Sequence, residues 1–326
     1  MAIQKKTIAI TGASGFIGSH LLPVLLGEGH RLCVLSRHPQ QDMPGISHIR
    51  GDIRSSHTVR DFVRGCSTVI HLAGVAHTSL RSQLEMDEAE RINVDGARNV
   101  LAAAQDASVE RVLLVSSAHV YTGQEGIGLV EHSSTSGDSF YARTKLMVEQ
   151  AGLEAASTNR LDVVIVRPCL IYGPCVRFNL ESMMRAIHGH YYFGIHGTNP
   201  IRSFLSVDNA ARAIAHLSQF GTSGRIYNIA DQSPMPLTEF VNSLADHMRV
   251  SRPRNLPMFA IRAAIAGASP LQWMGIRSPI NRDSLRKLTV SFTLDVNMLA
   301  ASGFQWSDDG QTIRKKMVDA FLGSRN

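Results

Sequence analysis

The sequence predicts a doubly wound α/β fold, in which helices cover both faces of a parallel sheet, together with a smaller and mostly helical lobe. In the first half of the chain, short apolar and β-branched segments alternate with segments whose apolar residues recur at helical spacing. The apolar segments lack polar–apolar alternation, which is typical of strands that are buried on both faces. Strand–helix–strand repetition then implies right-handed crossovers between parallel strands.

Five strands are expected early in the chain, at residues 7–11, 32–35, 69–72, 112–115 and 163–166. Helices are expected between them, including residues 92–104 and 141–156. After Pro168 the pattern becomes irregular, and a strand and a helix return at 204–217, followed by a strand at 226–229. We expect the irregular parts to lie over the carboxyl edge of the sheet, where open α/β sheets bind ligands.

The first predicted strand runs directly into a glycine loop with the spacing GxxGxxG, formed by Gly12, Gly15 and Gly18. One glycine permits the turn, one lets the backbone approach a pyrophosphate, and one lets the next helix pack closely. An ordinary strand–helix turn also contains glycines, but a loop that opens the first strand–helix–strand unit indicates a dinucleotide-binding (Rossmann) domain. The other loop residues expected to contact the dinucleotide are Ser14, Phe16 and Ile17.

The ends of the next strands bear on which dinucleotide is bound. An acidic residue about 20 residues after the glycines would bond the adenosine ribose, but this chain has Ser36 followed by Arg37. An arginine there can bind a 2′-phosphate, so NADP(H) is favoured over NAD(H), unless Arg37 is a solvated loop residue. Asp52 follows a further strand; it can accept from the adenine amino group or cap the helix that begins near Ser55, and the two roles are compatible.

Ser117, Tyr141 and Lys145 form the most informative group of polar residues. Ser116 and Ser117 end a buried strand, so a hydroxyl should emerge at the carboxyl edge of the sheet. Tyr141 and Lys145 are four residues apart, which places them on one face of a helix. Because an ammonium group beside a phenol of pKa about 10 favours the phenolate, Tyr141 is a candidate acid and base for a carbonyl or alcohol.

Composition excludes several classes of protein. Hydrophobic residues make up 44% of the 326 residues and charged residues 18%, which argues against disorder. Lysine and arginine number 33 against 27 acidic residues, but no basic run concentrates the excess, so it suits an anionic small substrate and not nucleic acid. The four cysteines lack CxxC spacing, so we expect no structural metal and a cytoplasmic location.

No signal peptide or membrane span is expected. The N-terminal segment has no long apolar stretch. Residues 257–276 are apolar but include Arg262, Pro270 and Gln272, so we expect an amphipathic helix that packs on the protein.

Short motifs occur in a fixed order along the chain. The first half contains GASGFIG at 12–18, Asp52-Ile53, His71-Leu-Ala-Gly74, Asn93-Val-Asp-Gly96, Val115-Ser-Ser117, YARTK at 141–145 and Arg167-Pro168. The second half contains Ile171-Tyr-Gly-Pro174, Asn179, RSFLSVDN at 202–209, YNIA at 227–230, Leu294-Asp295 and Gly303-Phe-Gln-Trp306. Together they resemble the extended short-chain dehydrogenases/reductases, and the second set resembles their nucleotide-sugar branch of 4-epimerases and 4-keto-reductases.

The resemblance implies a role for each matched position. Tyr141 would be the acid/base, Lys145 would lower its pKa and hold the nicotinamide ribose, and Ser117 would bond the reacting oxygen. Asn93 would support Lys145 through a water molecule. Further cofactor contacts are implied for Asp52, Ile53, Leu72, Ala73, Gly74, Ser116 and Pro168. Substrate contacts are expected for Thr78, Ser117, Asn179 and Arg202, the last two near the diphosphate.

The resemblance implies an NAD(P)-dependent oxidoreductase acting at C4 of a nucleotide-bound hexose or N-acetylhexosamine, with UDP as the nucleotide. A 4-keto-reductase in surface-polysaccharide precursor synthesis is favoured, because Ser36 and Arg37 favour an exchangeable NADP(H). A 4-epimerase is the alternative; a reductase of small ketones and a non-catalytic dinucleotide sensor are more remote. The 4,6-dehydratases carry an Asp-Glu pair where this chain has Ala118-His119, so dehydration is set aside.

Two domains are expected. Residues 1–170 with about 204–230 would form the dinucleotide-binding domain, and about 171–203 with 231–326 the substrate-binding lobe. The family often dimerises through two helices, one of which carries the YxxxK motif, so a homodimer is a further expectation.

Overall fold

The computed structural model describes residues 5–38, 43–75, 82–121, 126–158, 161–261 and 288–324. Thr78 and most of the apolar segment 257–276 lie outside these residues, so the expectations for them stay predictions. Within the described ranges, no helix combines the length and the apolar character needed to cross a membrane.

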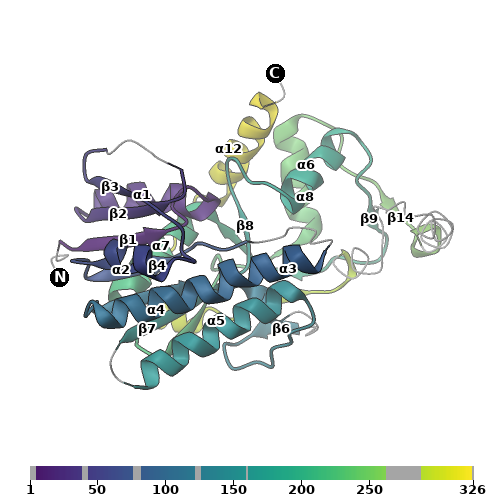
Figure 1. Ribbon diagram of the computed structural model, residues 1–326. Helices are drawn as coiled ribbons and strands as arrows, with labels where there is room; N and C mark the ends of the chain where they lie inside the picture. Colours follow the sequence, from purple (N-terminus) through teal and green to yellow (C-terminus); the bar gives the residue numbers. More distant parts are fainter. Residues whose placement is uncertain are drawn as a thin grey trace.

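A seven-stranded sheet forms the centre of the molecule and confirms the predicted fold class (Figure 1). Its order is β12-β7-β5-β4-β1-β2-β3, and every neighbouring pair is parallel. The strands are β1 (Thr7–Thr11), β2 (Arg31–Ser36), β3 (Ile46–Arg50), β4 (Thr68–His71), β5 (Arg111–Val115), β7 (Asp162–Pro168) and β12 (Arg225–Ile229). The strand order reverses between β1 and β4, which is where open α/β sheets bind ligands at their carboxyl edge.

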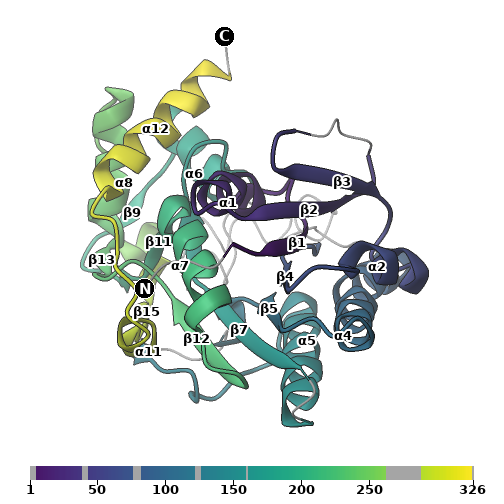
Figure 2. The ribbon, with the colours of Figure 1, turned by 90° about the vertical axis from the view of Figure 1, so that its left-hand side faces the viewer.

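Helices cover both faces of the sheet because its strands are apolar on both sides. One face carries α1 (Phe16–Gly27) and α7 (Val207–Phe220), and the other carries α2 (Ser56–Val63), α4 (Gly96–Asp106) and α5 (Phe140–Ser157) (Figure 2).

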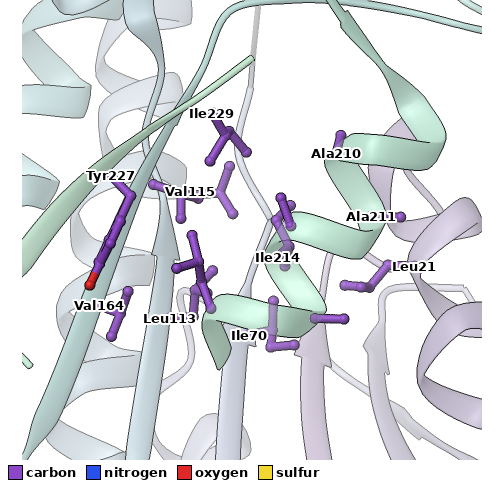
Figure 3. Packing of buried hydrophobic residues seen from close by; sticks show 14 of the residues in the cluster. Leu21, Ile70, Leu113, Val115, Val164, Ala210, Ala211, Ile214, Tyr227 and Ile229 are labelled. Atoms are coloured by element: carbon purple, nitrogen blue, oxygen red, sulfur yellow. The ribbon is translucent and has the colours of Figure 1, made fainter. Parts of the chain in front are cut away.

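On the first face, Ile214 of α7 lies on the side of Leu113 and Val115 of the sheet, and Ala211 faces Leu21 of α1 (Figure 3). All five side chains are buried, and full burial of a valine or isoleucine contributes roughly 1.5–3 kcal/mol to stability. This packing fixes the strands whose carboxyl ends carry the polar residues described below.

A second group of helices lies beside the central sheet (Figure 1). These helices enclose a separate apolar core. The group consists of α6 (Asn179–His188), α8 (Leu237–Met248) and α12 (Gly310–Gly323). In this core Phe204 and Phe240 stack with ring centroids 4.0 Å apart, and Tyr172 meets both rings edge-on. We refer to these helices and the short strands around them as the lobe.

The strands of the lobe are short and pair across long sequence distances. A four-stranded sheet has the order β13-β10-β15-β6, formed by Met235–Pro236, Ile201–Arg202, Phe292–Leu294 and Gly126–Leu129. Two further pairs join β8 (Leu170–Tyr172) to β11 (Phe204–Ser206) and β9 (Gly194–Ile195) to β14 (Asn255–Leu256). Between β15 and α12 lies the short helix α11 (Asn297–Ala301). The sheet of the lobe thus includes β6, a strand from the first 170 residues, which were assigned to the dinucleotide-binding domain. The predicted domain boundaries stay a proposal.

Candidate active site

The glycine loop is tightly packed at the point where the strand order reverses. Gly12 has φ +74°, and a Cβ there would lie 2.6 Å from the backbone nitrogen of Ala73. A Cβ on Gly18 would lie 2.5 Å from the carbonyl oxygen of Gly12. Gly15 is the N-cap of α1 and supplies no side-chain cap to its first turn. The N–H groups at this helix end are therefore available to an anion such as a pyrophosphate.

The loop after β4 is fixed against the glycine loop by a buried threonine. The Thr11 hydroxyl lies 2.8 Å from His71 Nδ1 and accepts from the Ala73 N–H at 3.2 Å. Burial first, and then the charge of Lys145, lower the pKa of His71 to about 3, so this imidazole is neutral at ordinary pH. Leu72 and Gly74 complete the loop that was predicted to line the cofactor. Gly74 lies close to Lys145, since a Cβ at this position would be 3.6 Å from the Lys145 Nζ.

Besides Arg37, the end of the site where the adenosine is expected contains a second arginine, Arg54. Ser36 ends β2 and Arg37 follows it, exposed. Asp52 pairs with Arg54, whose Nε lies 3.0 Å from Oδ1 and whose Nη2 lies 2.7 Å from Oδ2. The hydrogen bond from Arg54, and more weakly the charge of Arg37, hold the pKa of Asp52 below its usual value. The suggestion that Asp52 caps the next helix is wrong, because Ser55 is the N-cap of α2. Neighbouring Ile53 is largely buried.

The predicted group of serine, tyrosine and lysine comes together at the carboxyl end of β5. Ser139 caps α5 by accepting from the Ala142 N–H at 3.1 Å, which starts the helix just before Tyr141. Lys145 lies one turn later, and its Nζ is 5.8 Å from the centroid of the Tyr141 ring. Ser117 follows β5 and its side chain is hydrogen-bonded to Tyr141.

Burial dominates the protonation of this group. It raises the pKa of Tyr141 to about 12, although the hydrogen bond with Ser117 opposes the shift. It lowers the pKa of Lys145 to about 8, opposed by the charge of Glu149. The sequence-based expectation of a lowered phenol pKa is therefore wrong, because burial disfavours the charged phenolate and raises the pKa above its usual value. At neutral pH Tyr141 is a phenol with a proton to give.

Asn93 connects the loop after β4 to α5. It lies in a single π-helical turn, Arg91–Asp95, between α3 (Gln83–Glu90) and α4. Its Oδ1 accepts from the Val75 N–H at 2.7 Å, and its Nδ2 donates to the Thr144 hydroxyl at 3.2 Å. A Cβ on Gly74 would lie 3.1 Å from the same Oδ1 and 3.6 Å from Lys145 Nζ, so Asn93 and Lys145 border one space. π-turns of this kind occur often at functional sites.

His119 faces the candidate acid. It lies in the short helical turn Ala118–Tyr121, and its ring meets the Tyr141 ring edge-on with centroids 6.0 Å apart. Its backbone N–H donates to the Ser117 side-chain oxygen at 3.2 Å. The position that holds an acid in dehydratases thus contacts the tyrosine and the serine here.

The predicted substrate residues lie in or next to the lobe. Asn179 is the exposed first residue of α6. Arg202 is on β10, where its Nη2 donates to the Val290 carbonyl at 3.1 Å. Burial lowers the pKa of Arg202, opposed by the neighbouring Tyr192 phenol, which itself lines a cavity of about 80 Å³. Pro168 ends β7, between the sheet and the lobe.

Sequence reasoning missed two buried charges behind the site, Glu149 and Arg167. Arg167 was noted as part of a motif, but its partner was not identified. The signal for Glu149 is its position four residues after Lys145 on the same helix face.

Three comparisons with known proteins bear on identity. A model of the NAD dependent epimerase/dehydratase family matches residues 8–230. "Short-chain dehydrogenase/reductase family 42E member 1" of Xenopus laevis is 30% identical over 262 residues, covering 74% of this chain and 68% of that protein. "2-alkyl-3-oxoalkanoate reductase" of Stenotrophomonas maltophilia is 31% identical over 254 residues, covering 73% and 74%.

Among solved structures, MoeE5 in complex with UDP-glucose and NAD superposes with a TM-score of 0.76 at 26% identity, covering 98% of this chain and 100% of that one. The match extends over both the sheet and the lobe. The chain therefore belongs to the NAD dependent epimerase/dehydratase family of extended short-chain dehydrogenases/reductases, and it is an NAD-dependent enzyme.

Proposed function

We propose that the protein is a 4-keto-reductase of a nucleotide-bound hexose or N-acetylhexosamine, with UDP as the nucleotide. The observation that carries this proposal is the protonated phenol of Tyr141, held by Ser117 and bordered by Lys145 at the carboxyl edge of the sheet. A buried phenol with a pKa of about 12 is ready to donate a proton, which reduction of a ketone requires.

The side chains divide the reduction between them. A nicotinamide cofactor held by the glycine loop and Lys145 would supply a hydride to the carbonyl carbon. Tyr141 donates its proton to the carbonyl oxygen as that oxygen becomes an alkoxide, and the Ser117 hydroxyl donates a hydrogen bond to the same oxygen. The Lys145 ammonium balances the charge of the resulting phenolate, which regains its proton from solvent. The product is the C4 alcohol.

The nucleotide part of the substrate is proposed from two supports. MoeE5, which resembles this chain over its whole length, was solved with UDP-glucose. In this chain the largely buried Arg202 guanidinium and the Tyr192 ring lie together in the lobe. A guanidinium can donate two parallel hydrogen bonds to a phosphate, so Arg202 would bind the diphosphate. A contact of Asn179 with the diphosphate rests on the family resemblance.

The proposal includes NADP(H) as the preferred cofactor. Arg37 and Arg54 lie around the single carboxylate of Asp52, which Arg54 already engages. This arrangement leaves Arg37 available to a 2′-phosphate beside Ser36. A role in surface-polysaccharide precursor synthesis, and a homodimer formed through helices that include α5, rest on the family resemblance alone.

The second candidate function is reduction of an apolar ketone that carries no nucleotide, and the names of two relatives favour it. The two curated relatives described above are named as a short-chain dehydrogenase/reductase and a reductase of alkyl oxoalkanoates, and neither name refers to a nucleotide. The same serine, tyrosine and lysine would reduce an apolar ketone without using Arg202. A 4-epimerase would also use this triad, but would return the hydride to the same sugar.

Mass spectrometry of UDP-4-keto sugars incubated with NADH or NADPH tests the proposal. A reductase converts the 4-keto sugar into a product heavier by two hydrogens and consumes the cofactor stoichiometrically. An epimerase is tested with the corresponding UDP-hexose, which it would convert into the C4 isomer, separable by chromatography, without net consumption of cofactor. Reduction of 2-alkyl-3-oxo acids that is unaffected by free UDP would instead support the second candidate. The Tyr141→Phe protein is the matched control for hydride transfer catalysed at this site.

A further inference from the structure

A buried carboxylate lies one helical turn after Lys145. Glu149 has only 3% of its surface exposed. Its Oε1 accepts from the Ser116 hydroxyl at 2.5 Å and from Arg167 Nε at 2.8 Å, and its Oε2 accepts from Arg167 Nη2 at 2.6 Å. Because a buried charge is costly unless it is paired and hydrogen-bonded, these contacts fix where the carboxylate lies.

Arg167 is itself fixed from the side opposite Glu149. Its Nη1 donates to the Tyr121 hydroxyl at 2.6 Å and to the Glu131 carbonyl at 2.9 Å. Its guanidinium carbon lies 4.8 Å from the Tyr121 ring centroid, and the Tyr121 hydroxyl donates to Asn228 at 2.9 Å. The pair thus joins α5 to β7 and β12, and Ser116 adds the end of β5.

The groups around Lys145 decide whether it keeps its proton. Its Nζ donates to the Val115 carbonyl at 2.8 Å, so the amine cannot turn freely toward solvent. From β4 it faces His71, which is neutral, and from its own helix it faces Tyr141, which is also neutral at pH 7. Burial lowers the pKa of Lys145 to about 8, and the negative charge of Glu149 opposes that shift.

We propose that Glu149 is a positioning residue for the reaction: its carboxylate, held by Ser116 and Arg167, keeps Lys145 as an ammonium ion beside Tyr141. The inference rests on the role given to Lys145 in the proposed function. A neutral amine at this point would not balance the phenolate that forms when Tyr141 gives up its proton. The same contacts tie the helix that carries Tyr141 to the end of β5, from which Ser117 follows.

The ionisation of Lys145 can be measured without any substrate. In protein labelled with carbon-13 lysine, the Cε resonance of Lys145 is followed against pH, and Lys145→Met assigns it. Glu149→Gln is expected to lower the pKa of Lys145 by about one pH unit or more, because an opposite charge nearby is lost. Glu149→Asp keeps the charge and should restore at least part of that shift. An unchanged Lys145 pKa in Glu149→Gln overturns the proposal.

Loss of the carboxylate alone leaves Arg167 buried without its partner, and this protein could fail to fold. The double variant Glu149→Gln with Arg167→Met removes both charges at similar volume and permits the same titration. A lower pKa of Lys145 there supports the proposal, and an unchanged pKa overturns it.

A matched control separates this effect from general loss of stability. Asp162→Asn breaks the part-buried pair with Arg111 at the opposite edge of the sheet, and it should leave the Lys145 pKa unchanged. In activity assays, the basic limb of the kcat/KM profile should move to lower pH in Glu149→Gln but not in this control. If the protein turned over no nucleotide sugar, the proposed function would fail while the titration result would stand.

Discussion

The hydroxyl group of Tyr141 allows a direct test of the proposed proton transfer. Tyr141→Phe keeps the ring, including its edge-on contact with His119, and removes the proton that the ketone oxygen would receive. Because loss of a general acid costs on the order of 10²–10⁴ in rate, kcat should fall by that factor while cofactor affinity stays within about threefold. Stopped-flow reduction and fluorescence titration of the cofactor measure the two quantities. Near-normal kcat in this variant would remove Tyr141 from the mechanism.

The pH dependence of the reaction should report Lys145. Its pKa is about 8, whereas that of Tyr141 is about 12, so the phenol remains protonated across the working range. The ammonium is the active form, and it is lost as pH rises. The kcat/KM for ketone reduction should therefore be level below about pH 7 and fall through about pH 8. A basic limb that begins only above pH 10 would mean that Lys145 is not required as a cation.

Selectivity for the cofactor is a residue-scale prediction about Ser36 and Arg37. A charged hydrogen bond to the 2′-phosphate contributes about 1.5–3 kcal/mol, so NADPH should bind about ten- to a hundredfold more tightly than NADH. The double change Ser36→Asp with Arg37→Ile should reverse the preference, because a carboxylate accepts from the ribose hydroxyl and repels the phosphate. Equal affinities for the two reduced cofactors in the unmodified protein would instead mean that Arg37 makes no phosphate contact.

At the scale of elements, the strands of the sheet could be predicted from the sequence, but the contact between Glu149 and Arg167 behind the site could not. Strands buried on both faces are apolar throughout, so β1, β4, β5 and β7 were recognisable without knowing their neighbours. The glycine loop and the Tyr141–Lys145 spacing are local patterns of the same kind. The Glu149–Arg167 pair joins a helix to a strand 18 residues later, and no local pattern in the sequence specifies that contact.

The turn between β1 and α1 gives a prediction about an element boundary. Gly12→Ala would hold alanine at φ +74° and place its Cβ 2.6 Å from Ala73. The conformation alone costs roughly 1–2 kcal/mol, so the free energy of unfolding should fall by at least that amount and cofactor binding should weaken. Gly27→Ala, at the end of α1 with nothing within 4 Å of its Cβ, is the control and should be neutral or slightly stabilising. Equal stability of the two variants in urea would contradict the described loop.

For the whole molecule, the relation of the lobe to the sheet could not be predicted in detail. Strands such as β9, β10, β13 and β14 are two residues long, and they exist only because distant segments pair with them. In the same way, Arg202 acquires its surroundings from Tyr192 and Val290, which lie 10 and 88 residues away in the sequence. The sequence identified Arg202 by motif, but its burial depends on the folded lobe.

Arg202 therefore tests whether the lobe binds the nucleotide. Arg202→Leu replaces the guanidinium on β10 by an apolar side chain and so removes its charge-assisted hydrogen-bond donors. Such donors contribute about 1.5–3 kcal/mol to a phosphate contact. KM for a UDP-sugar should rise about ten- to a hundredfold and inhibition by free UDP should weaken in parallel, while kcat changes less. Arg185→Leu is the control, because Arg185 is an exposed residue of α6 that pairs with Glu181. Arg202→Leu could instead leave UDP inhibition unchanged while an alkyl oxo acid was still reduced. The lobe would then bind a substrate without a nucleotide, and reduction of an apolar ketone would replace the nucleotide-sugar proposal.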